Sequence, residues 1–450
     1  MKQIKIVVVG MGPVGVVTAT TFAEHGYQVV GVDIAPNLIT SLSRGELHFF
    51  EPGLEELLRQ TIDSGCLSFT DSPTIPFQES DIIFITVGTP FQNGKLDVSG
   101  VERVVETILE AVPPHSRKII AIRSTVTPGT NERIREVVGR RKHEHAIVSV
   151  PEFFSEGNAL RAAKYPDRII VATLDKWALP TMHVLFEPFL RLSQTPFIDD
   201  IDPASAEFTK VFANCMLALR ISAMNEFACL IDGAETGANI ENVRRGIGTD
   251  PRIGLAFLYP GIGFGGSCFP KDVAGLVALA KEYGIDTPII EAILKINEKQ
   301  KRRLFTSATK HFVRDNFHGL VFAVWGIAFK DGTSDTRESP GVELVWQLVS
   351  ASATVVVYDP HINTQDLANL NFPEERVRLV TQPYDALQGV SALFVTTPYR
   401  GWRTFDYERA MAAMHERVIF DGRNLYDPSE MAERGFFCYS IGRPVGIPKM

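Results

Sequence analysis

The first 33 residues constrain the fold more than any other stretch of the chain. An apolar, β-branched run over residues 4–9 leads directly into a turn that contains three glycines, Gly10, Gly12 and Gly15. A helical stretch over 16–25 follows, and a second apolar run over 28–32 ends in Asp33. Strand, glycine turn, helix, strand and acid within about 30 residues are typical of the dinucleotide-binding βαβ unit. The glycines let the backbone approach a pyrophosphate, and the Asp33 carboxylate would bind ribose hydroxyls.

The residues around Asp33 also select the dinucleotide. A carboxylate at this position repels a 2′-phosphate, and the following Ile34 and Ala35 supply no arginine to receive one. The sequence therefore predicts NAD, rather than NADP, as the cofactor.

Strands and helices continue to alternate after Asp33. Apolar runs over 81–87, 118–122 and 146–150 are separated by helical stretches, which include 54–62 and 98–111. This order predicts an α/β fold with a doubly wound parallel sheet, in which ligands bind beyond the carboxyl ends of the strands.

Polar residues follow each of these three strands. Thr89 and Thr125 come after the first two, where they either meet a ligand or only cap turns. Glu152 and Glu156 stand four residues apart after the third, so a short turn would present both carboxylates to the cleft. Two solvated surface glutamates are the alternative.

The stretch 261–272, GIGFGGSCFPKD, places Cys268 between a glycine-rich loop and a helix that Pro270 begins. The helix N-terminus and the adjacent Lys271 are expected to lower the pKa of the thiol and make it reactive, whereas an unreactive buried cysteine is the alternative. The glycines before it let the backbone approach a ligand. They also match G-x-G-x-x-G, but the short preceding flank ends in Pro260, so we expect no second dinucleotide-binding strand here.

A long helical pattern begins at Pro203 and is ended by Gly233 and Gly237. Lys210 and Asn214 lie at positions i and i+4 of this helix and therefore share a face. Apolar residues cover most of the remaining surface, which indicates a helix buried on several sides. A lysine on such a helix is costly unless it serves a site or an ion pair. More helix is predicted over 289–308.

A second α/β section begins near His318. Its apolar strand candidates alternate with helical stretches such as 341–350 and lie at 320–325, 354–358, 392–396 and 418–420. Three basic residues follow such strands, where they would meet phosphates or remain ordinary surface charges: Lys330, Arg337 and Arg423.

Composition argues against several other classes of protein. The chain of 450 residues has a net charge of −8, which provides no basic field for nucleic acid or anionic lipid. No uninterrupted apolar stretch reaches the roughly 18 residues of a membrane span. The five cysteines are widely spaced and show no zinc pattern, so we expect no metal and a cytoplasmic location with reduced thiols.

A series of motifs in a fixed order covers residues 10–424. In addition to the glycine turn, the 203–233 helix and the cysteine loop, they are FEPGL at 50–54, VGTP at 87–90, STVTPGT at 124–130, PEFFSEG at 151–157, DPRIG at 250–254, GIAFK to DTRESP at 326–340 and DGRN at 421–424. With these motifs the chain resembles the UDP-glucose/GDP-mannose dehydrogenase family. The resemblance implies two Rossmann-like α/β domains joined by a long central helix and a helical domain. Their expected extents are 1–202 for NAD binding, 203–310 for dimerisation and the active site, and 311–450 for binding of the UDP-sugar.

The resemblance also implies a reaction. UDP-glucose would be oxidised by four electrons to UDP-glucuronate, with two NAD reduced in turn and the aldehyde never released. Cys268 would attack the aldehyde to give a thiohemiacetal, a second hydride would leave, and the resulting thioester would be hydrolysed.

Other residues take catalytic roles by the same resemblance. Lys210 and Asn214 would stabilise developing oxyanions. Asp272 would position or deprotonate water, and Thr125 would help to hold that water. Glu152 would be a second acid or base.

Two sets of ligand-binding residues are implied as well. One set would contact NAD: Gly10, Gly12, Val14, Gly15, Asp33, Thr89, Thr125, Glu156, Lys271 and Arg337. The other would bind the nucleotide sugar: Glu152, Phe153, Lys210, Asn214, Arg252, Phe257, Gly265, Phe329, Lys330 and Arg423. Arg252 would act across a homodimer built on the central helix.

Some residues depart from the family pattern. Arg123 and Val150 stand where lysine and asparagine are more usual, but neither is expected to touch the chemistry. TPYR at 397–400 replaces the more usual Thr-Glu-Trp, which leaves the contacts at that edge open. A GDP-mannose or other nucleotide-sugar 6-dehydrogenase of the same mechanism is the alternative function. A two-electron hydroxyacid dehydrogenase or a non-catalytic nucleotide-sugar sensor would have no need of Cys268.

Overall fold

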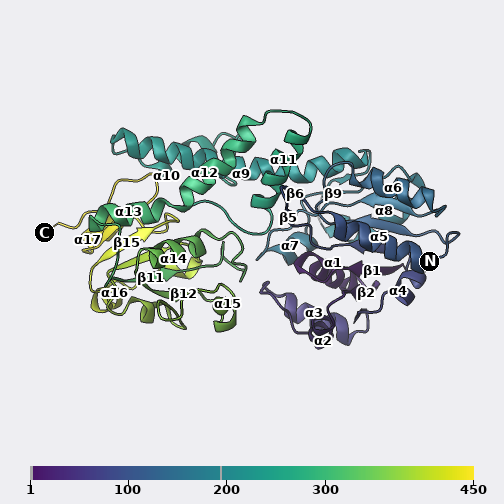
Figure 1. Cartoon of the computed structure of the whole chain (residues 1–450), viewed down its shortest axis with the longest axis horizontal. Helices are drawn as coiled ribbons and strands as arrows, with labels where there is room; N and C mark the ends of the chain where they lie inside the picture. The colour runs from purple at the N-terminus through teal and green to yellow at the C-terminus, as the bar shows by residue number, and fades with distance from the viewer. Residues whose placement is uncertain (1–3, 193–194, 450) are drawn as a thin grey trace. The chain divides into compact units, whose positions relative to one another are not determined.

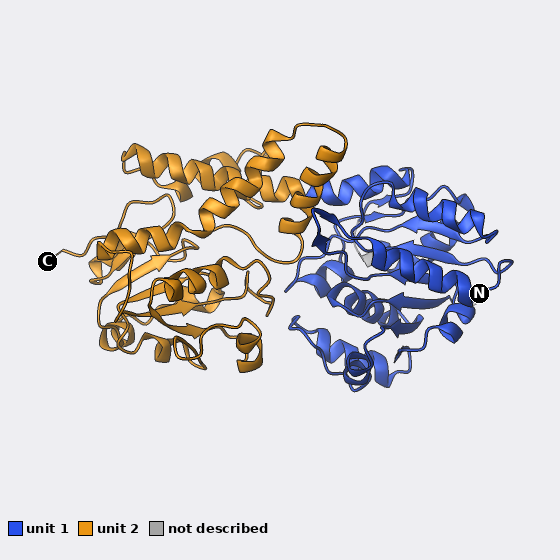
Figure 2. Ribbon diagram, in the orientation of Figure 1, with its two compact units in different colours: residues 1–213 blue, residues 214–450 orange. Residues whose placement is uncertain are grey.

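The computed structural model describes residues 4–192 and 195–449. The chain forms two compact units, residues 1–213 and 214–450, which Figure 2 shows in different colours. The boundary between them falls inside one long helix, α9 (Pro203–Ala234).

Unit 1 is built on a six-stranded parallel sheet with the strand order β3-β2-β1-β4-β7-β8. Figure 1 labels β1 and β2 of this sheet together with helix α1, which connects them. Its strands are β1 (Lys5–Val9), β2 (Gln28–Val32), β3 (Leu67–Thr70), β4 (Ile82–Ile85), β7 (Ile119–Ile122) and β8 (Ala146–Ser149). Its helices are α1 (Pro13–Glu24), α2 (Pro36–Ser43), α3 (Leu54–Asp63), α4 (Thr74–Glu79), α5 (Ser99–Ala111), α6 (Thr130–Arg140), α7 (Ala159–Lys164) and α8 (Leu179–Leu192). Two short strand pairs complete the unit: β5 (Phe91–Gln92) with β6 (Lys95–Leu96), and β9 (Ile169–Ile170) with β10 (Phe197–Ile198).

Helices cover both faces of this sheet. In β1, Ile6 and Val8 pack into a core shared with α1, α3 and α8, whereas Val7 and Val9 pack into a second core shared with α5 and α6. A strand buried on both faces reads as a continuous apolar run, which is why the sequence revealed it. The predicted doubly wound α/β fold is confirmed.

Unit 2 contains a second parallel sheet with the equivalent strand order, β13-β12-β11-β14-β15-β16. Its strands are β11 (Val321–Trp325), β12 (Thr354–Tyr358), β13 (Val377–Val380), β14 (Ala392–Val395), β15 (Val418–Asp421) and β16 (Phe437–Tyr439). Its helices, besides the later turns of α9, are α10 (Ile240–Gly248), α11 (Phe269–Glu282), α12 (Pro288–Lys301), α13 (Arg303–Phe312), α14 (Pro340–Ser350), α15 (Thr364–Ala368), α16 (Tyr407–Ala413) and α17 (Pro428–Glu433).

Helix α9 begins at Pro203, as predicted, and is 32 residues long. It is the one helix in the described part of the chain whose length and composition would allow it to cross a membrane. The polar side chains of Glu207, Lys210 and Asn214 are nevertheless buried along it. Ionisable groups are expensive in lipid, so this pattern is typical of a core helix that serves a site.

The first strand of each sheet is followed by a glycine that makes the same backbone hydrogen bond. In unit 1 the Gly10 N–H donates to the Val32 carbonyl over 2.8 Å, and in unit 2 the Gly326 N–H donates to the Tyr358 carbonyl over 2.8 Å. In unit 1 helix α1 begins at Pro13, directly after this turn, whereas in unit 2 residues 326–339 separate β11 from α14. The two sheets therefore share the position of this glycine but not the length of the connection.

An acid follows the second strand of both sheets, but the two acids differ in exposure. Asp33 is partly exposed, and the neighbouring Ile34 is 94% exposed. Asp359 is buried, and its Oδ1 accepts a hydrogen bond from the Tyr399 hydroxyl at 2.9 Å. The carboxylate of the first sheet therefore faces an open surface, whereas that of the second sheet is capped by a phenol.

Candidate active site

The turn after β1 excludes side chains at two of its glycines. Gly10 has a φ of +94°, and a Cβ there would lie 2.9 Å from the backbone of Val87. A Cβ at Gly15 would lie 1.8 Å from the Gly10 carbonyl oxygen. At Gly12, the N-cap of α1, an added Cβ would meet nothing within 4 Å, and Val14 is in the first turn. Helix α1 therefore begins at an open surface, where its unpaired N–H groups suit a pyrophosphate.

Asp33 supplies the second part of this binding surface. Its Oδ2 accepts the N–H of Met11 at 2.8 Å, and its Oδ1 accepts the N–H of Ala35 at 3.0 Å. The carboxylate is thus held in one orientation while it remains partly exposed. A helix N-terminus for pyrophosphate and a fixed carboxylate for ribose hydroxyls fit NAD.

The loops that follow β4 and β7 are tied together by hydroxyl groups. The buried Thr89 hydroxyl donates to the Thr125 carbonyl at 2.6 Å, and the Ser124 hydroxyl donates to the Val87 carbonyl at 2.7 Å. The Thr89 hydroxyl therefore has a structural role, because it holds the two loops together. Contacts of Thr89 and Thr125 with NAD remain predictions.

Lys210 and Glu152 form a buried ion pair in unit 1. The Lys210 Nζ lies 3.2 Å from Glu152 Oε1, and both residues are almost fully buried. Glu152 Oε2 also accepts the N–H of Phe154 at 2.5 Å. The ion pair expected for a lysine on this helix is therefore present, and the solvated alternative for Glu152 is wrong. Glu156 is partly buried, in the turn that follows.

Arg123 is closer to this pair than the sequence suggested. Burial lowers the pKa of its guanidinium to about 10, and the nearby Glu152 carboxylate opposes that shift. The guanidinium lies 5.0 Å from the centre of the Phe154 ring, while Arg168 lies 3.6 Å from that of Phe153. The expectation that Arg123 does not touch the site is corrected: two arginines pack against the Glu152 loop.

Cys268 is the N-cap of α11, as predicted, and Pro270 is in the first turn of that helix. The Asp272 N–H donates to the Cys268 carbonyl at 3.0 Å, which closes the turn. The Ser267 hydroxyl is 3.5 Å from the Cys268 sulfur. No strand precedes this loop between α10 and α11, a segment that the structure describes throughout, as the sequence predicted.

The Asp272 carboxylate lies in a polar network in the first turn of α11. Its Oδ2 accepts the Asn214 side-chain amide at 2.6 Å, and its Oδ1 accepts the Lys271 ammonium at 2.6 Å. The carboxylate is buried. Because both oxygens are bound, the orientation of Asp272 relative to Cys268 is fixed. The ammonium of Lys271 is directed to Asp272, and a contact between Lys271 and NAD remains a prediction.

Close packing around the loop, in addition to the predicted approach of a ligand, explains why glycines precede Cys268. A Cβ at Gly265 would lie 2.3 Å from the Glu338 carbonyl oxygen, and a Cβ at Gly266 would lie 2.8 Å from the Phe329 ring. Gly265 and Phe329, both predicted to bind substrate, therefore belong to one tightly packed surface of unit 2.

Three buried amide side chains that the sequence did not single out hold this loop. Asn225 Oδ1 accepts the Gly261 N–H at 2.8 Å, and the Gln300 amide donates to the Gly261 carbonyl at 2.7 Å. Asn297 accepts the Phe264 N–H at 2.8 Å and donates to the Phe264 carbonyl at 3.0 Å. The available signal was polar residues on buried helix faces, with Asn297 and Gln300 three apart on α12.

Arg423 joins the carboxyl edge of the second sheet to the cysteine loop. Its Nε donates to the Thr396 carbonyl at 2.6 Å and its Nη1 to the Gly263 carbonyl at 3.1 Å. Burial lowers the pKa of the guanidinium to about 10, against the attraction of Asp421. The surface-charge alternative for Arg423 is therefore wrong.

Of the other two basic residues of this edge, Arg337 is exposed and Lys330 is half-buried. Arg337 forms a bidentate pair with Asp335, with Nε–Oδ1 at 2.9 Å and Nη2–Oδ2 at 2.6 Å, and its carbonyl accepts the Gly266 N–H at 2.8 Å. The Lys330 ammonium lies 5.6 Å from the centre of the Phe329 ring. A cofactor contact of Arg337 and a phosphate contact of Lys330 remain predictions.

Arg252 and Phe257 lie on the segment between α10 and α11. The Arg252 side chain is 87% exposed, and its only ion-pair partner among the described residues is Asp250, at 2.6 Å. Phe257 has a φ of +60°, and its ring centre lies 6.0 Å from that of Phe269. A contact of Arg252 with a partner subunit remains a prediction.

The fold and the first glycine turn define an NAD-binding dehydrogenase with two Rossmann-like sheets. Family models match the chain in order: the UDP-glucose/GDP-mannose dehydrogenase family NAD binding domain at residues 4–190, the central domain at 204–299 and the UDP binding domain at 323–428. The chain belongs to the UDP-glucose/GDP-mannose dehydrogenase family. It is an NAD-dependent oxidoreductase, and it carries the family's UDP-binding domain.

Similar proteins extend along almost the whole chain. A UDP-glucose 6-dehydrogenase of Pseudomonas aeruginosa is 39% identical over 98% of this chain and 98% of its own length. One of Rhizobium meliloti is 35% identical over 98% and 100%. Among solved structures, a UDP-glucose dehydrogenase of Pyrobaculum islandicum has a TM-score of 0.88 and 31% identity, with 98% of each chain covered. A UDP-D-ManNAc dehydrogenase of Pyrococcus horikoshii has a TM-score of 0.83 and 27% identity, covering 98% of this chain and 99% of its own.

Proposed function

We propose that the protein oxidises UDP-glucose to UDP-glucuronate with two equivalents of NAD, through a thioester on Cys268. The observation that carries this proposal is Cys268 at the start of α11, one turn before the fixed carboxylate of Asp272. The names of the similar proteins support UDP-glucose as the substrate.

The first stage converts the sugar C6 hydroxyl to an aldehyde. NAD, when bound, supplies the acceptor for the hydride that leaves C6. Lys210 stabilises the oxygen as negative charge develops on it. Glu152, 3.2 Å from Lys210, takes the hydroxyl proton. Burial of this ion pair keeps bulk water away from the proton transfer.

The second stage uses the thiol. The Cys268 sulfur bonds to C6 and the aldehyde oxygen takes a proton, which gives a thiohemiacetal. Loss of a second hydride and that proton leaves a thioester. Asp272, oriented by Asn214, removes a proton from water that Thr125 helps to hold. The water oxygen bonds to C6, the C6–sulfur bond breaks, and Cys268 is released as the thiolate beside a carboxylic acid product.

Ligand binding divides between the two units in this proposal. The turn of Gly10, Gly12, Val14 and Gly15, with Asp33, Thr89, Thr125, Glu156, Lys271 and Arg337, contacts NAD. Phe153, Arg252, Phe257, Gly265, Phe329, Lys330 and Arg423, with the catalytic polar residues, bind the nucleotide sugar. We assign residues 1–202, 203–310 and 311–450 to the NAD-binding, central and UDP-binding domains.

Homodimerisation and a cytoplasmic location belong to the same proposal. Helix α9 leaves the large apolar side chains of Met216, Phe227 and Leu230 exposed, which suits an interface between two copies of the chain. The exposed Arg252 supports its action in the site of a partner subunit. The five cysteines are all free thiols, which suits a reducing compartment.

The stoichiometry of NADH formation tests the function. Limiting UDP-glucose with excess NAD should give two NADH per sugar, and GDP-mannose in a parallel sample should give none. One NADH per UDP-glucose would contradict the thioester route. If GDP-mannose gave two NADH and UDP-glucose gave none, the substrate would be GDP-mannose, and the four-electron mechanism would still stand.

Substitution of the thiol tests the mechanism separately. Cys268→Ser should abolish formation of the acid, because an un-ionised serine hydroxyl is a far poorer nucleophile than a thiolate at neutral pH, and an alkoxide is a far poorer leaving group. Cys66→Ser, at a partly buried cysteine of unit 1, is the matched control and should keep wild-type turnover. Acid formation at the normal rate by Cys268→Ser would refute the covalent route.

A further inference from the structure

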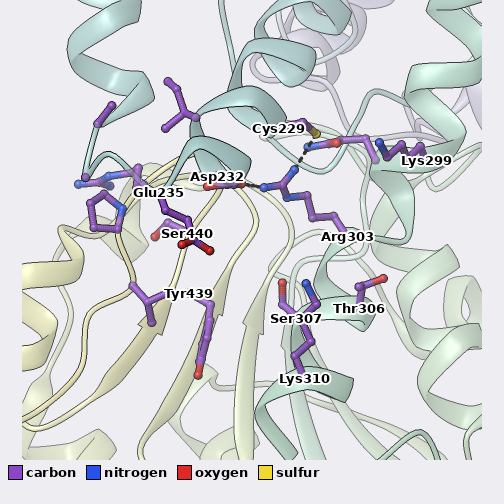
Figure 3. Close-up of a pocket in the computed structure, with 17 residues that line it drawn as sticks. Cys229, Asp232, Glu235, Lys299, Arg303, Thr306, Ser307, Lys310, Tyr439 and Ser440 are labelled. Atoms are coloured by element: carbon purple, nitrogen blue, oxygen red, sulfur yellow. Dashed lines mark hydrogen bonds and ion pairs between the residues drawn. The ribbon is translucent and has the colours of Figure 1, made fainter. Parts of the chain in front are cut away.

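We infer that unit 2 contains a second ligand site, a cleft that binds a sugar phosphate apart from the proposed active site. The cleft has a volume of about 700 Å³ and is lined by α9, α12, α13 and the segment that follows β16 (Figure 3). Small-molecule sites commonly occupy about 300–1,000 Å³. Of the residues assigned above to NAD, nucleotide sugar or catalysis, none lines this cleft.

The cleft is positive in a protein that is acidic overall. Its charged side chains are Lys299, Arg303, Lys310 and Arg443 against Asp232 and Glu235. The whole chain carries a net charge of −8. A concave surface with a local excess of cations in an acidic protein attracts an anion.

One wall of the cleft presents cation, hydroxyl and cation along a helix. Arg303, Ser307 and Lys310 lie at positions i, i+4 and i+7 of α13, and the side chains of Ser307 and Lys310 stand next to each other in Figure 3. Arg303 is directed to Asp232 and also donates to the Cys229 sulfur at 2.9 Å. Ser307 and Lys310 therefore form the part of this wall that remains open to a phosphate group.

The lysines of the cleft are not neutralised by protein. Within residues 4–192 and 195–449, neither Lys299 nor Lys310 forms an ion pair. Both side chains are exposed, one in the last turn of α12 and one in the last turn of α13. Ammonium groups with hydroxyl neighbours are ordinary ligands for phosphate oxygens.

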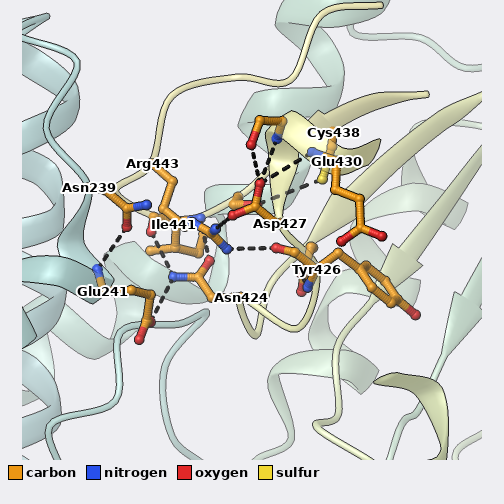
Figure 4. Close-up of polar contacts among 12 residues, drawn as sticks. Asn239, Glu241, Asn424, Tyr426, Asp427, Glu430, Cys438, Ile441 and Arg443 are labelled. Carbon is orange, nitrogen blue, oxygen red and sulfur yellow. Dashed lines mark hydrogen bonds and ion pairs between the residues drawn. The ribbon is translucent and has the colours of Figure 1, made fainter. Parts of the chain in front are cut away.

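Arg443 forms a fixed part of the cleft wall. Its side chain is only 7% exposed, and it lines the cleft. Its Nη1 donates to the Tyr426 carbonyl at 2.6 Å and its Nη2 pairs with Asp427 at 2.8 Å (Figure 4). These contacts hold the guanidinium in one place, so Arg443 shapes the cleft while the exposed Lys299 and Lys310 remain available to an anion.

The other walls indicate that the phosphate is attached to an organic body. Ile231, Pro444, Val445 and the Tyr439 ring add apolar surface to the cleft. A free phosphate ion would leave most of this surface unused. A sugar phosphate places its anionic group on the α13 wall and its body against these residues.

Calorimetric titration tests this site on the full-length protein. NADH and UDP are present at saturation to fill the two family sites, and the probes are glucose 1-phosphate and inorganic phosphate. We expect saturable binding of glucose 1-phosphate, with Lys310→Ala and Lys299→Ala each weakening it about tenfold, a factor equal to 1.4 kcal/mol. Lys295→Ala, at an exposed lysine of α12 outside the cleft, should bind like wild type.

Three outcomes would overturn the inference. The first is the absence of binding by either probe to wild-type protein. The second is equal binding by wild type, Lys310→Ala and Lys299→Ala while circular dichroism shows all three folded. The third is equal affinity for inorganic phosphate and glucose 1-phosphate, which would show that the organic part of the ligand contributes nothing to binding. Turnover of UDP-glucose is measured separately, so failure of this site and failure of the proposed function are distinguishable.

Discussion

Asn297 should control both the order of the cysteine loop and the stability of unit 2. Its side chain is 3% exposed and makes two hydrogen bonds to the backbone of Phe264, at 2.8 and 3.0 Å. Asn297→Ala removes both partners and leaves a buried N–H and a buried carbonyl without replacements. Each unsatisfied group costs about 1–3 kcal/mol, so the expected loss is about 2–6 kcal/mol. That is a large fraction of the roughly 5–15 kcal/mol that stabilises a domain.

Amide hydrogen exchange of residues 261–268 gives the most direct measurement. Local opening that becomes easier by about 2 kcal/mol speeds exchange roughly thirtyfold. Formation of UDP-glucuronate should fall as well, because this loop leads into Cys268. Lys295→Ala, an exposed position on the same helix, is the control and should change neither quantity.

The result that would refute this reasoning is specific. Exchange in the loop would match wild type in Asn297→Ala, and the free energy of unfolding in urea would change by less than about 0.5 kcal/mol, the usual effect of a surface substitution. The loop geometry would then be set by its glycines and by Arg423, and the amide would be dispensable.

Two further predictions concern buried carboxylates. Burial raises the pKa of Glu207 to about 7, above its ordinary 4.5, against hydrogen bonds from the backbone N–H groups of Asn131 and Gly129. The stabilising contribution of protonated Glu207 is therefore complete below about pH 4.5 and is lost as the pH rises through 7. At 1.36 kcal/mol per pKa unit, this contribution to the free energy of unfolding amounts to about 3 kcal/mol. Urea unfolding from pH 5 to 8 should show this loss in wild type and not in Glu207→Gln, and identical pH profiles would contradict it. Tyr399→Phe removes the buried hydrogen bond to Asp359 and should lower stability by about 1.5–3 kcal/mol, measured as a lower thermal midpoint; an unchanged midpoint would show that Asp359 finds another donor.

The sequence predicted those helices and strands that are determined by patterns within one short segment of the chain. The elements β1, α1 and β2 follow from an apolar run, a glycine turn and helical periodicity within a single short segment. The edge strands β3, β13 and β16 were not predicted, because each is short and only partly buried, so its apolar pattern is weak. The helix predicted over 289–308 divides at Arg302 into α12 and α13.

The residues of the site also divide into those that local sequence could predict and those that it could not. Cys268 at a helix start could be predicted from its neighbours, and Lys210 on an apolar helix indicated either a site or an ion pair without identifying its partner Glu152. The support of the loop by Asn225, Asn297 and Gln300 could not, because hydrogen bonds between residues 33–39 positions apart leave no periodic signal. Long-range polar contacts need the folded structure.

The position of the unit boundary has a consequence for biosynthesis. All six strands of the first large sheet come from residues 5–149, and none is contributed by unit 2. Chains are made from the N-terminus at about 5–20 residues per second, and domains generally fold as units. Unit 1 can therefore bury both faces of its sheet while the ribosome is still synthesising unit 2. Its apolar strands do not remain exposed to solvent until the chain is complete.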